Sequence, residues 1–431
     1  MGSIAKYPGR QGRESAAQPM IAALDIGTSK VAAVVARVLE DGGLEVLGVG
    51  RRPSLGMKRG AVTHIEQTIQ AIEGAVQEAE LMADCKIHSV YVGIAGSHIG
   101  GRNTEAVVAT RDGEVTEQDI DRVIDAAKSG TLPADHRILH ILPQDFVVDD
   151  QMDVRHPLGM SGQRLQGSIH VISCAVNAFT NIEKCVQGCG LHAEKIILEQ
   201  LASGEAVLTE DERELGVCVV DIGAGTTDIA VFIGGAIRYT ATIPIAGDQV
   251  TNDIAMALRT PTQCANEIKI KYASALAQVV TQDQDIEVIG MGDRASRRLS
   301  RQTLAEVVEP RYDELFSMVL AELERSDMLQ RLPAGIVLTG GSSSIEGAIQ
   351  LAESIFHLPV RVGNPFSPRM RGVVDVLRSP EYATVLGLLM WGQKELLGQG
   401  LGTGAMQRRQ DQGPGMFGKV KGLRAWFARN F

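Results

Sequence analysis

Residues 217–232 read VCVVDIGAGTTDIAVF, an apolar run that ends in Asp221 and continues into glycines and hydroxyl side chains. This pattern predicts a strand followed by a tight turn, because glycine permits backbone angles that other residues avoid. Backbone N–H groups and hydroxyls in such a turn can point at phosphate oxygens. A carboxylate at the strand end can hold Mg²⁺ directly or through water. The segment therefore predicts one wall of a phosphate site.

The same pattern occurs earlier in the chain, where IAALDIGTSK spans 21–30. One such stretch alone is equally consistent with an ordinary strand-to-turn sequence. Two of them predict two similar halves whose turns face each other and clamp phosphates, with Asp25 and Asp221 as the metal ligands. The residues assigned to the phosphates are Gly27, Thr28, Ser29, Lys30, Gly223, Gly225, Thr226 and Thr227.

A third motif, GIVLTGGSSSIEG at 335–347, reads as a strand, a double glycine and the start of a helix. Helix N-termini attract anions, and paired glycines let a ligand lie against the backbone. Taken alone, the motif is more often an ordinary strand-to-helix turn. Together with the two turns, it predicts that Gly340, Gly341 and Ser342 contact a nucleotide.

In this order and at these separations, the three motifs resemble those of actin-like ATPases, and in detail those of the FtsA family of bacterial cell-division proteins. The similarity covers about 20–391 and the extreme C-terminus, and the stretches that carry it include ELMADCKIHSVYVGIAG (80–96), LTEDERELGVCVVDIG (208–223) and RQTLAEVVEPRYDEL (301–315). The resemblance implies an α/β fold: an actin-like (ribonuclease H-like) duplicated nucleotide-binding fold with an inserted α+β subdomain. It also implies ATP and Mg²⁺ as ligands.

The pattern of strands and helices, read with this resemblance, divides the chain into seven kinds of segment. Within the insertion we expect a helix that starts near Thr116, with Glu117 and Asp119 in its first turn. A flexible linker is expected where the chain is rich in Gly and Gln and lacks hydrophobic periodicity. The predicted parts are a flexible N-terminal tail (1–19), a first actin-like half (20–96 and 176–216), the FtsA-type insertion (97–175), a second half (217–259 and 331–391), a helical subdomain (260–330), the linker (392–414) and a membrane-targeting amphipathic helix (415–431).

The resemblance implies further contacts with the ligand. NEIKIKYASAL at 266–276 is similar to a helix that holds ribose and adenine, where related proteins commonly have Glu-x-x-Lys and this chain has Asn266 and Lys269. LEQLASGEAVL at 198–208 resembles a connecting helix that supplies a water-positioning residue, for which Glu199 is the matching position. The alternative for Glu199 is a capping or surface carboxylate, which is common at helix starts.

A cluster of basic residues follows at 294–311. The resemblance implies that it receives an acidic or amphipathic peptide, the C-terminal tail of the tubulin-like protein FtsZ. The alternative is a solvated charged face, because charge clusters are frequent on surfaces. The residues concerned are Arg297, Arg298, Arg301 and Arg311.

The C-terminal stretch GMFGKVKGLRAWFARNF (415–431) combines an apolar stripe at helical spacing with four cations and no acidic side chain. This composition is typical of a helix that lies in a membrane interface. The alternative is a terminal helix packed on the body. The residues expected to enter the membrane are Phe417, Val420, Leu423, Trp426 and Phe427. The resemblance implies anionic lipid on the cytoplasmic face of the inner membrane, at the division site.

Composition limits the other classes of function. Lys and Arg total 42 against 52 Asp and Glu, a net charge of −10, which argues against nucleic acid as a partner. The six cysteines are scattered, as expected in a reducing cytoplasm, and no second Cys or His pair completes a zinc site with Cys185 and Cys189. The isolated stretch GMGDRA (290–295) lacks the context of a dinucleotide site and is read as a turn.

The predicted function is a membrane adaptor that binds ATP, self-assembles, tethers FtsZ and contacts other division proteins. The sequence leaves open whether ATP is hydrolysed. One competing class is a sugar or small-acid kinase of the same superfamily, for which no base for an acceptor substrate is recognisable. Another is an Hsp70-like chaperone, which needs a large C-terminal substrate domain, whereas only 40 residues follow position 391.

Overall fold

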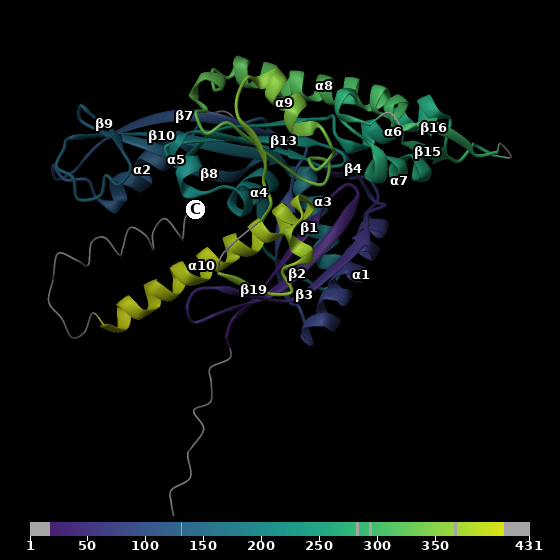
Figure 1. Cartoon of the computed structure of the whole chain (residues 1–431). Helices are drawn as coiled ribbons and strands as arrows, with labels where there is room; N and C mark the ends of the chain where they lie inside the picture. The colour runs from purple at the N-terminus through teal and green to yellow at the C-terminus, as the bar shows by residue number, and fades with distance from the viewer. Residues whose placement is uncertain (1–17, 131, 282–283, 293–294, 366–368, 409–431) are drawn as a thin grey trace, which may run out of the picture.

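The computed structural model describes residues 18–130, 132–281, 284–292, 295–365 and 369–408 (Figure 1). The first half is built on a six-stranded sheet in the order β11-β6-β1-β2-β3-β19. β1, β2 and β3 form an antiparallel meander, and β6 and β11 add to it in parallel. Its strands are β1 (Met20–Ile26), β2 (Lys30–Val38), β3 (Leu44–Pro53), β6 (Ser89–Ile94), β11 (His192–Leu198) and β19 (Met370–Gly372).

The second half repeats this arrangement in a five-stranded sheet of order β14-β13-β12-β17-β18. An antiparallel meander is again followed by two parallel strands, so β12 corresponds to β1 and β17 to β6. The strands are β12 (Val217–Ile222), β13 (Thr227–Ile233), β14 (Ala236–Ile243), β17 (Ile336–Thr339) and β18 (Val360–Val362). The duplication predicted from the two Asp-Ile-Gly motifs is confirmed.

Helices cover these sheets because the strands are apolar on both faces. β12 buries all of its side chains, and β1 buries all but Met20. The helices of the first half are α1 (Ile65–Ala83), α3 (Val176–Gly188), α4 (Glu199–Val207) and α5 (Glu210–Leu215), and those of the second are α6 (Gly247–Leu258), α7 (Thr262–Tyr272), α8 (Arg301–Arg325) and α9 (Ala348–Phe356). A short β4–β5 hairpin (Met57–Lys58, Ala61–Val62) precedes α1. No helix of the described ranges combines the length and apolar character that crossing a bilayer requires.

The insertion has its own four-stranded antiparallel sheet, β7-β10-β8-β9, and its own hydrophobic core. The elements are β7 (Ile99–Ala109), α2 (Glu117–Lys128), β8 (His136–Val148), β9 (Gln151–Val154) and β10 (Arg164–Ala175). Helix α2 begins after Thr116 as expected. A capping box fixes this start, in which the Asp119 carboxylate accepts the Thr116 N–H at 2.9 Å while Thr116 Oγ1 accepts the Asp119 N–H.

Residues 260–330 contain, beside α7 and α8, a hairpin of β15 (Asp285–Val288) and β16 (Arg297–Ser300) that precedes α8. One expectation about secondary structure needs correction. The flexible linker does not start at 392, because α10 runs from Ala383 to Arg408 and extends away from the body (Figure 1).

Tertiary contacts explain why α10 continues beyond 392. Lys394 pairs with Glu205 and Glu395 with Lys195, both at 2.6 Å, while Leu396 packs against the core of the first half. These contacts, at residues 394–396, stabilise the beginning of the segment that composition alone assigns to a linker. Residues 409–414 lie outside the described residues, as do residues 1–17 of the N-terminal tail and the whole membrane-targeting segment 415–431 with its five membrane residues.

Candidate functional site

A cavity of about 740 Å³ is lined by residues of both halves. Every residue that the sequence assigned to nucleotide, metal or water positioning lies in its wall, with the exception of Thr227. These lining residues are Asp25, Gly27, Thr28, Ser29, Lys30, Glu199, Asp221, Gly223, Gly225, Thr226, Asn266, Lys269, Gly340, Gly341 and Ser342. Segments that are more than 300 residues apart in the chain thus meet at one site.

The two predicted turns have the same backbone geometry. Gly27 donates its N–H to the Lys30 carbonyl at 2.9 Å, and Gly223 donates to the Thr226 carbonyl at 3.0 Å. The turns also face each other closely, since a Cβ added to Gly225 would lie 2.5 Å from Thr28 Oγ1. A side chain larger than hydrogen therefore does not fit at position 225, and backbone groups and hydroxyls of both turns are available to a ligand between them.

Thr227 points away from the cavity. Its side chain is fully buried and donates a hydrogen bond from Oγ1 to the Ile245 carbonyl at 2.7 Å. Successive side chains of a strand point to opposite faces, so Thr226 and Asp228 face the cavity and Thr227 faces the core between them. The sequence assignment of Thr227 to the ligand is not supported by its position.

Carboxylates concentrate on the cavity wall around the two turns. Burial raises the pKa of Asp221 to about 7, with Asp228 and Asp25 adding to the shift, and burial also raises the pKa of Asp25. The pKa of the half-buried Glu199 is raised well above its usual range by burial and by the charges of Asp25, Asp228 and Asp221. Carboxylates held this way in the apo protein favour a cation beside them.

Mg²⁺ fits this part of the cavity only together with a ligand. In the described part of the chain, no three His, Cys, Asp or Glu side chains come together as a metal site. Protein Mg²⁺ sites of the nucleotide type use one or two carboxylates, and phosphate oxygens and water complete the coordination. Asp25 and Asp221, each buried at the end of a strand beside a phosphate turn, supply such a pair.

Asp228 is a cavity residue that sequence reasoning missed. It lies opposite Asp221 in the β12–β13 register and accepts hydrogen bonds from Thr226 Oγ1 at 2.9 Å and Thr242 Oγ1 at 2.6 Å. Burial raises its pKa to about 6 despite these bonds. The sequence stretch GTTD contained a signal for Asp228. Side chains alternate between the two faces of a strand, so Asp228, two positions after Thr226, lies on the same face as Thr226.

Replacing Asp228 is expected to stabilise the ligand-free protein in a pH-dependent manner. A carboxyl whose pKa is higher in the folded state than in the unfolded state destabilises the fold above the folded pKa, and this penalty disappears as pH falls below the unfolded pKa. Asp228→Asn should therefore raise the melting temperature at pH 8, and the gain should shrink toward pH 4.5. Thermal unfolding measures the melting temperature at both pH values. An equal increase at pH 8 and at pH 4.5 would contradict the raised pKa of Asp228.

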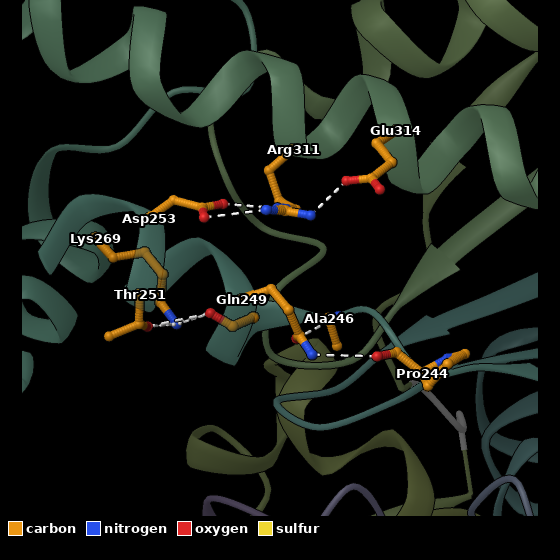
Figure 2. A network of polar contacts seen from close by, with 9 residues as sticks. Pro244, Ala246, Gln249, Thr251, Asp253, Lys269, Arg311 and Glu314 are labelled. Atoms are coloured by element: carbon orange, nitrogen blue, oxygen red, sulfur yellow. Dashed lines mark hydrogen bonds and ion pairs between the residues drawn. The ribbon is translucent and has the colours of Figure 1, made fainter. Parts of the chain in front are cut away.

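The part of the cavity that the sequence assigned to the nucleoside is formed by α6, α7 and the double-glycine loop. Lys269 donates from Nζ to Thr251 Oγ1 at 2.8 Å (Figure 2) and to the Gly247 carbonyl at 2.9 Å. Ser342 donates to the Gly223 carbonyl at 2.9 Å, which ties the double-glycine loop to the second turn. Burial lowers the pKa of Lys269, and Asp248 opposes this shift.

The four arginines assigned to a partner do not form one cluster. Arg311 pairs with Asp253, with Nε–Oδ2 at 2.6 Å, and with Glu314 on its own helix (Figure 2). Arg301 lies in the cavity wall, donates to the Tyr272 carbonyl at 2.7 Å and pairs with Glu346. Arg297 and Arg298 belong to β16. Arg311 lies ten positions after Arg301 on α8, roughly 15 Å along the helix axis.

Comparison with known proteins places the chain in a family. A family model described as "Cell division protein FtsA" matches residues 218–387, and one described as "SHS2 domain inserted in FTSA" matches 96–173. Cell division protein FtsA of Pseudomonas aeruginosa is 58% identical over 413 residues, which covers 96% of this chain and 98% of the relative. The chain belongs to the FtsA family. FtsA of Escherichia coli K12 is 43% identical over 419 residues, covering 96% of this chain and 98% of that protein.

Solved structures show the fold of this FtsA-family chain to be actin-like. The PilM-PilN type IV pilus biogenesis complex matches with a TM-score of 0.64 at 18% identity, covering 86% of this chain and 98% of that one. MreB5 of Spiroplasma citri bound to ADP matches with a TM-score of 0.53 at 14% identity, covering 88% and 98%. The expected α/β fold with an FtsA-type insertion is confirmed, and the matched insertion agrees closely with the predicted 97–175.

Proposed function

We propose that this cell-division protein binds ATP with Mg²⁺, self-assembles on the cytoplasmic face of the inner membrane and tethers FtsZ there, which helps to organise the septal division machinery. The observation that supports nucleotide binding most strongly is the pair of identical glycine turns that face each other across one cavity. Membership of the FtsA family supports the role in division. Nucleotide is proposed to tune assembly, with at most slow hydrolysis.

Different groups of cavity residues would bind different parts of Mg²⁺-ATP, according to their chemistry. Gly27 and Gly223 would close the two turns with their own N–H groups, and the other backbone N–H groups of the turns, with the hydroxyls of Thr28, Ser29 and Thr226, would bind phosphate oxygens. Asp25 and Asp221 would hold Mg²⁺, which neutralises phosphate charge when bound. Asn266, Lys269 and the backbone of the double-glycine loop would bind the nucleoside, and Glu199 would position water. The solved MreB5 structure, which has this fold, is bound to ADP and so supports a nucleotide in the cavity.

Self-assembly and membrane binding are proposed from the resemblance and from the position of α10. This helix contacts the body as far as Leu396 and extends away from it (Figure 1), and the basic, apolar segment 415–431 follows it in the sequence. A segment with that composition binds reversibly to anionic lipid, and several copies in one assembly bind more firmly through avidity.

A reconstitution experiment tests this function as a whole. The purified chain, ATP and Mg²⁺ are added to vesicles that contain anionic lipid, and fluorescent FtsZ is then added. FtsZ should accumulate on the vesicles only when the chain is present, and nucleotide should change the size of the assemblies. Equal FtsZ accumulation with and without the chain would reject the tethering role.

The proposed FtsZ contact rests on Arg298 of β16, because Arg297 donates to the Leu258 carbonyl at 2.7 Å and Arg301 and Arg311 form internal ion pairs. Arg298→Glu should weaken binding of an acidic FtsZ tail peptide by roughly twofold to fivefold, the effect of one exposed ion pair. Fluorescence anisotropy measures this affinity. Arg111→Glu, at an exposed arginine of the insertion, is the matched control and should leave the affinity unchanged. Equal affinities for both variants would remove Arg298 from the contact.

A further inference from the structure

A buried histidine of the insertion reaches the first half of the protein beside the cavity. His140 lies on β8, is 5% exposed, and its Nε2 lies 3.0 Å from the backbone nitrogen of Leu198. A backbone N–H can only donate, so Nε2 is the acceptor and the ring proton is on Nδ1. Burial, aided by the charge of Lys195, lowers the pKa of His140 to about 3, which keeps the imidazole neutral.

The residue that His140 contacts is the one that orients Glu199. Leu198 is the last residue of β11 and the N-cap of α4, and no side chain of its own caps that helix. Glu199 follows as the first residue of the helix and lies in the cavity wall. The direction in which the strand turns into the helix therefore determines where the Glu199 carboxylate points, and the bond from His140 is made at that turn.

The Glu199 side chain is also held from the opposite side. It lies on the backbone of Gly93 in β6, where an added Cβ would be 3.0 Å from Glu199 Cγ and 3.1 Å from Oε1. β6 pairs with β11 in parallel, with Ile197 opposite Gly93. The carboxylate is thus confined between a glycine that leaves room for it and a helix start that His140 fixes.

Helix α10 supports His140 from behind. The Trp391 ring packs on the imidazole, with centroids 5.8 Å apart and planes tilted by 42°. Lys195 lies 5.6 Å from the centroid of the same Trp391 ring and pairs with Glu395 of α10. Packing on this side restricts the rotamer of His140, so that its Nε2 stays directed at Leu198.

We propose that His140 is a positioning residue for the nucleotide site: through the Leu198 N–H it orients Glu199 toward the phosphates, and the insertion thereby contributes to the handling of ATP. This inference rests on the proposed binding of ATP. It gives the insertion a direct structural connection to the reacting end of the cavity. It also predicts that the acceptor atom at Nε2 matters and that the histidine charge does not.

The test compares two replacements at this position in the full-length chain. His140→Leu removes the acceptor and should lower the single-turnover rate of ATP cleavage by roughly tenfold or more, with the ATP Kd changed by less than about twofold. His140→Gln places an amide oxygen near the position of Nε2 and should restore the rate to within about threefold of the parent. Radiolabelled ATP allows slow cleavage to be measured.

Two further variants separate positioning from loss of stability. His170→Leu removes an equally buried histidine of the same sheet, 1% exposed and bonded to Thr240, and should leave the cleavage rate unchanged. Gly93→Ala keeps His140 but displaces the Glu199 side chain, and should lower the rate as His140→Leu does. Melting temperatures of all variants show whether each one folds.

The outcomes distinguish this inference from the proposed function. A parent protein that binds no ATP would reject the proposed function itself. A parent that binds ATP but never cleaves it would overturn the positioning role. The same conclusion follows if His140→Leu cleaves ATP at the parental rate, or if His140→Gln is as slow as His140→Leu.

Discussion

Gly340→Ala is expected to reduce the affinity for Mg²⁺-ATP by roughly a hundredfold or more, which corresponds to about 2.7 kcal/mol. Gly340 has a φ of +85°, a conformation that L side chains rarely adopt. An added Cβ would lie 2.3 Å from Asp221 Oδ1 and 2.5 Å from the Ile222 carbonyl oxygen. A single methyl group therefore displaces the carboxylate that is proposed to hold Mg²⁺, although position 340 follows a different strand, β17.

The adjacent glycine provides a matched control for this prediction. A Cβ on Gly341 would meet only Glu381 Cβ, at 3.6 Å, which is an ordinary van der Waals distance. Gly341→Ala should therefore keep most of the affinity. Both variants can be titrated with a fluorescent ATP analogue in the presence and absence of Mg²⁺. If both variants lost a similar amount of ATP affinity, the double glycine would not act by leaving room for Asp221.

Removal of residues 415–431 is expected to release the protein from anionic vesicles, with at least a hundredfold loss of apparent affinity. A large apolar side chain that enters the membrane contributes roughly 1.5–3 kcal/mol, and a cation near the headgroups about 1 kcal/mol, before the cost of ordering the segment. The segment supplies five assigned apolar residues and four cations. Co-sedimentation with vesicles that contain anionic lipid measures the change.

Two controls accompany the truncation. The truncated protein should bind ATP as the parent does, because the cavity is formed by residues between 25 and 384. Trp426→Glu should weaken attachment without changing the melting temperature. Continued pelleting of the truncated protein would mean that the anchor lies elsewhere, and a simultaneous loss of ATP affinity would mean that the segment contacts the body.

Local sequence patterns determined the features of this protein that depend only on residues close together in the chain, such as its turns and helix starts. The two Asp-Ile-Gly motifs predicted the duplicated fold because an apolar strand followed by glycine encodes its own turn, and both turns form the same bond. The capping box at Thr116 and Asp119 predicted the start of α2 for the same reason. All but one of the residues that the sequence assigned to the nucleotide site line the cavity, since the fold brings its turns to one place.

Other features were decided by contacts between distant segments, which no local pattern encodes. Thr227, which was expected at the ligand, points into the core, and Asp228, for which no role was expected, faces the cavity, because the face of each depends on where β13 begins. The first residues after 391 are part of α10 because Lys195 and Glu205 pair with Glu395 and Lys394. Arg301 lies in the cavity wall because it pairs with Glu346 and donates a hydrogen bond to the Tyr272 carbonyl. His140 meets Leu198 across 58 positions, a contact that exists only once the insertion has packed against the first half, because hydrogen bonds form between neighbours in space.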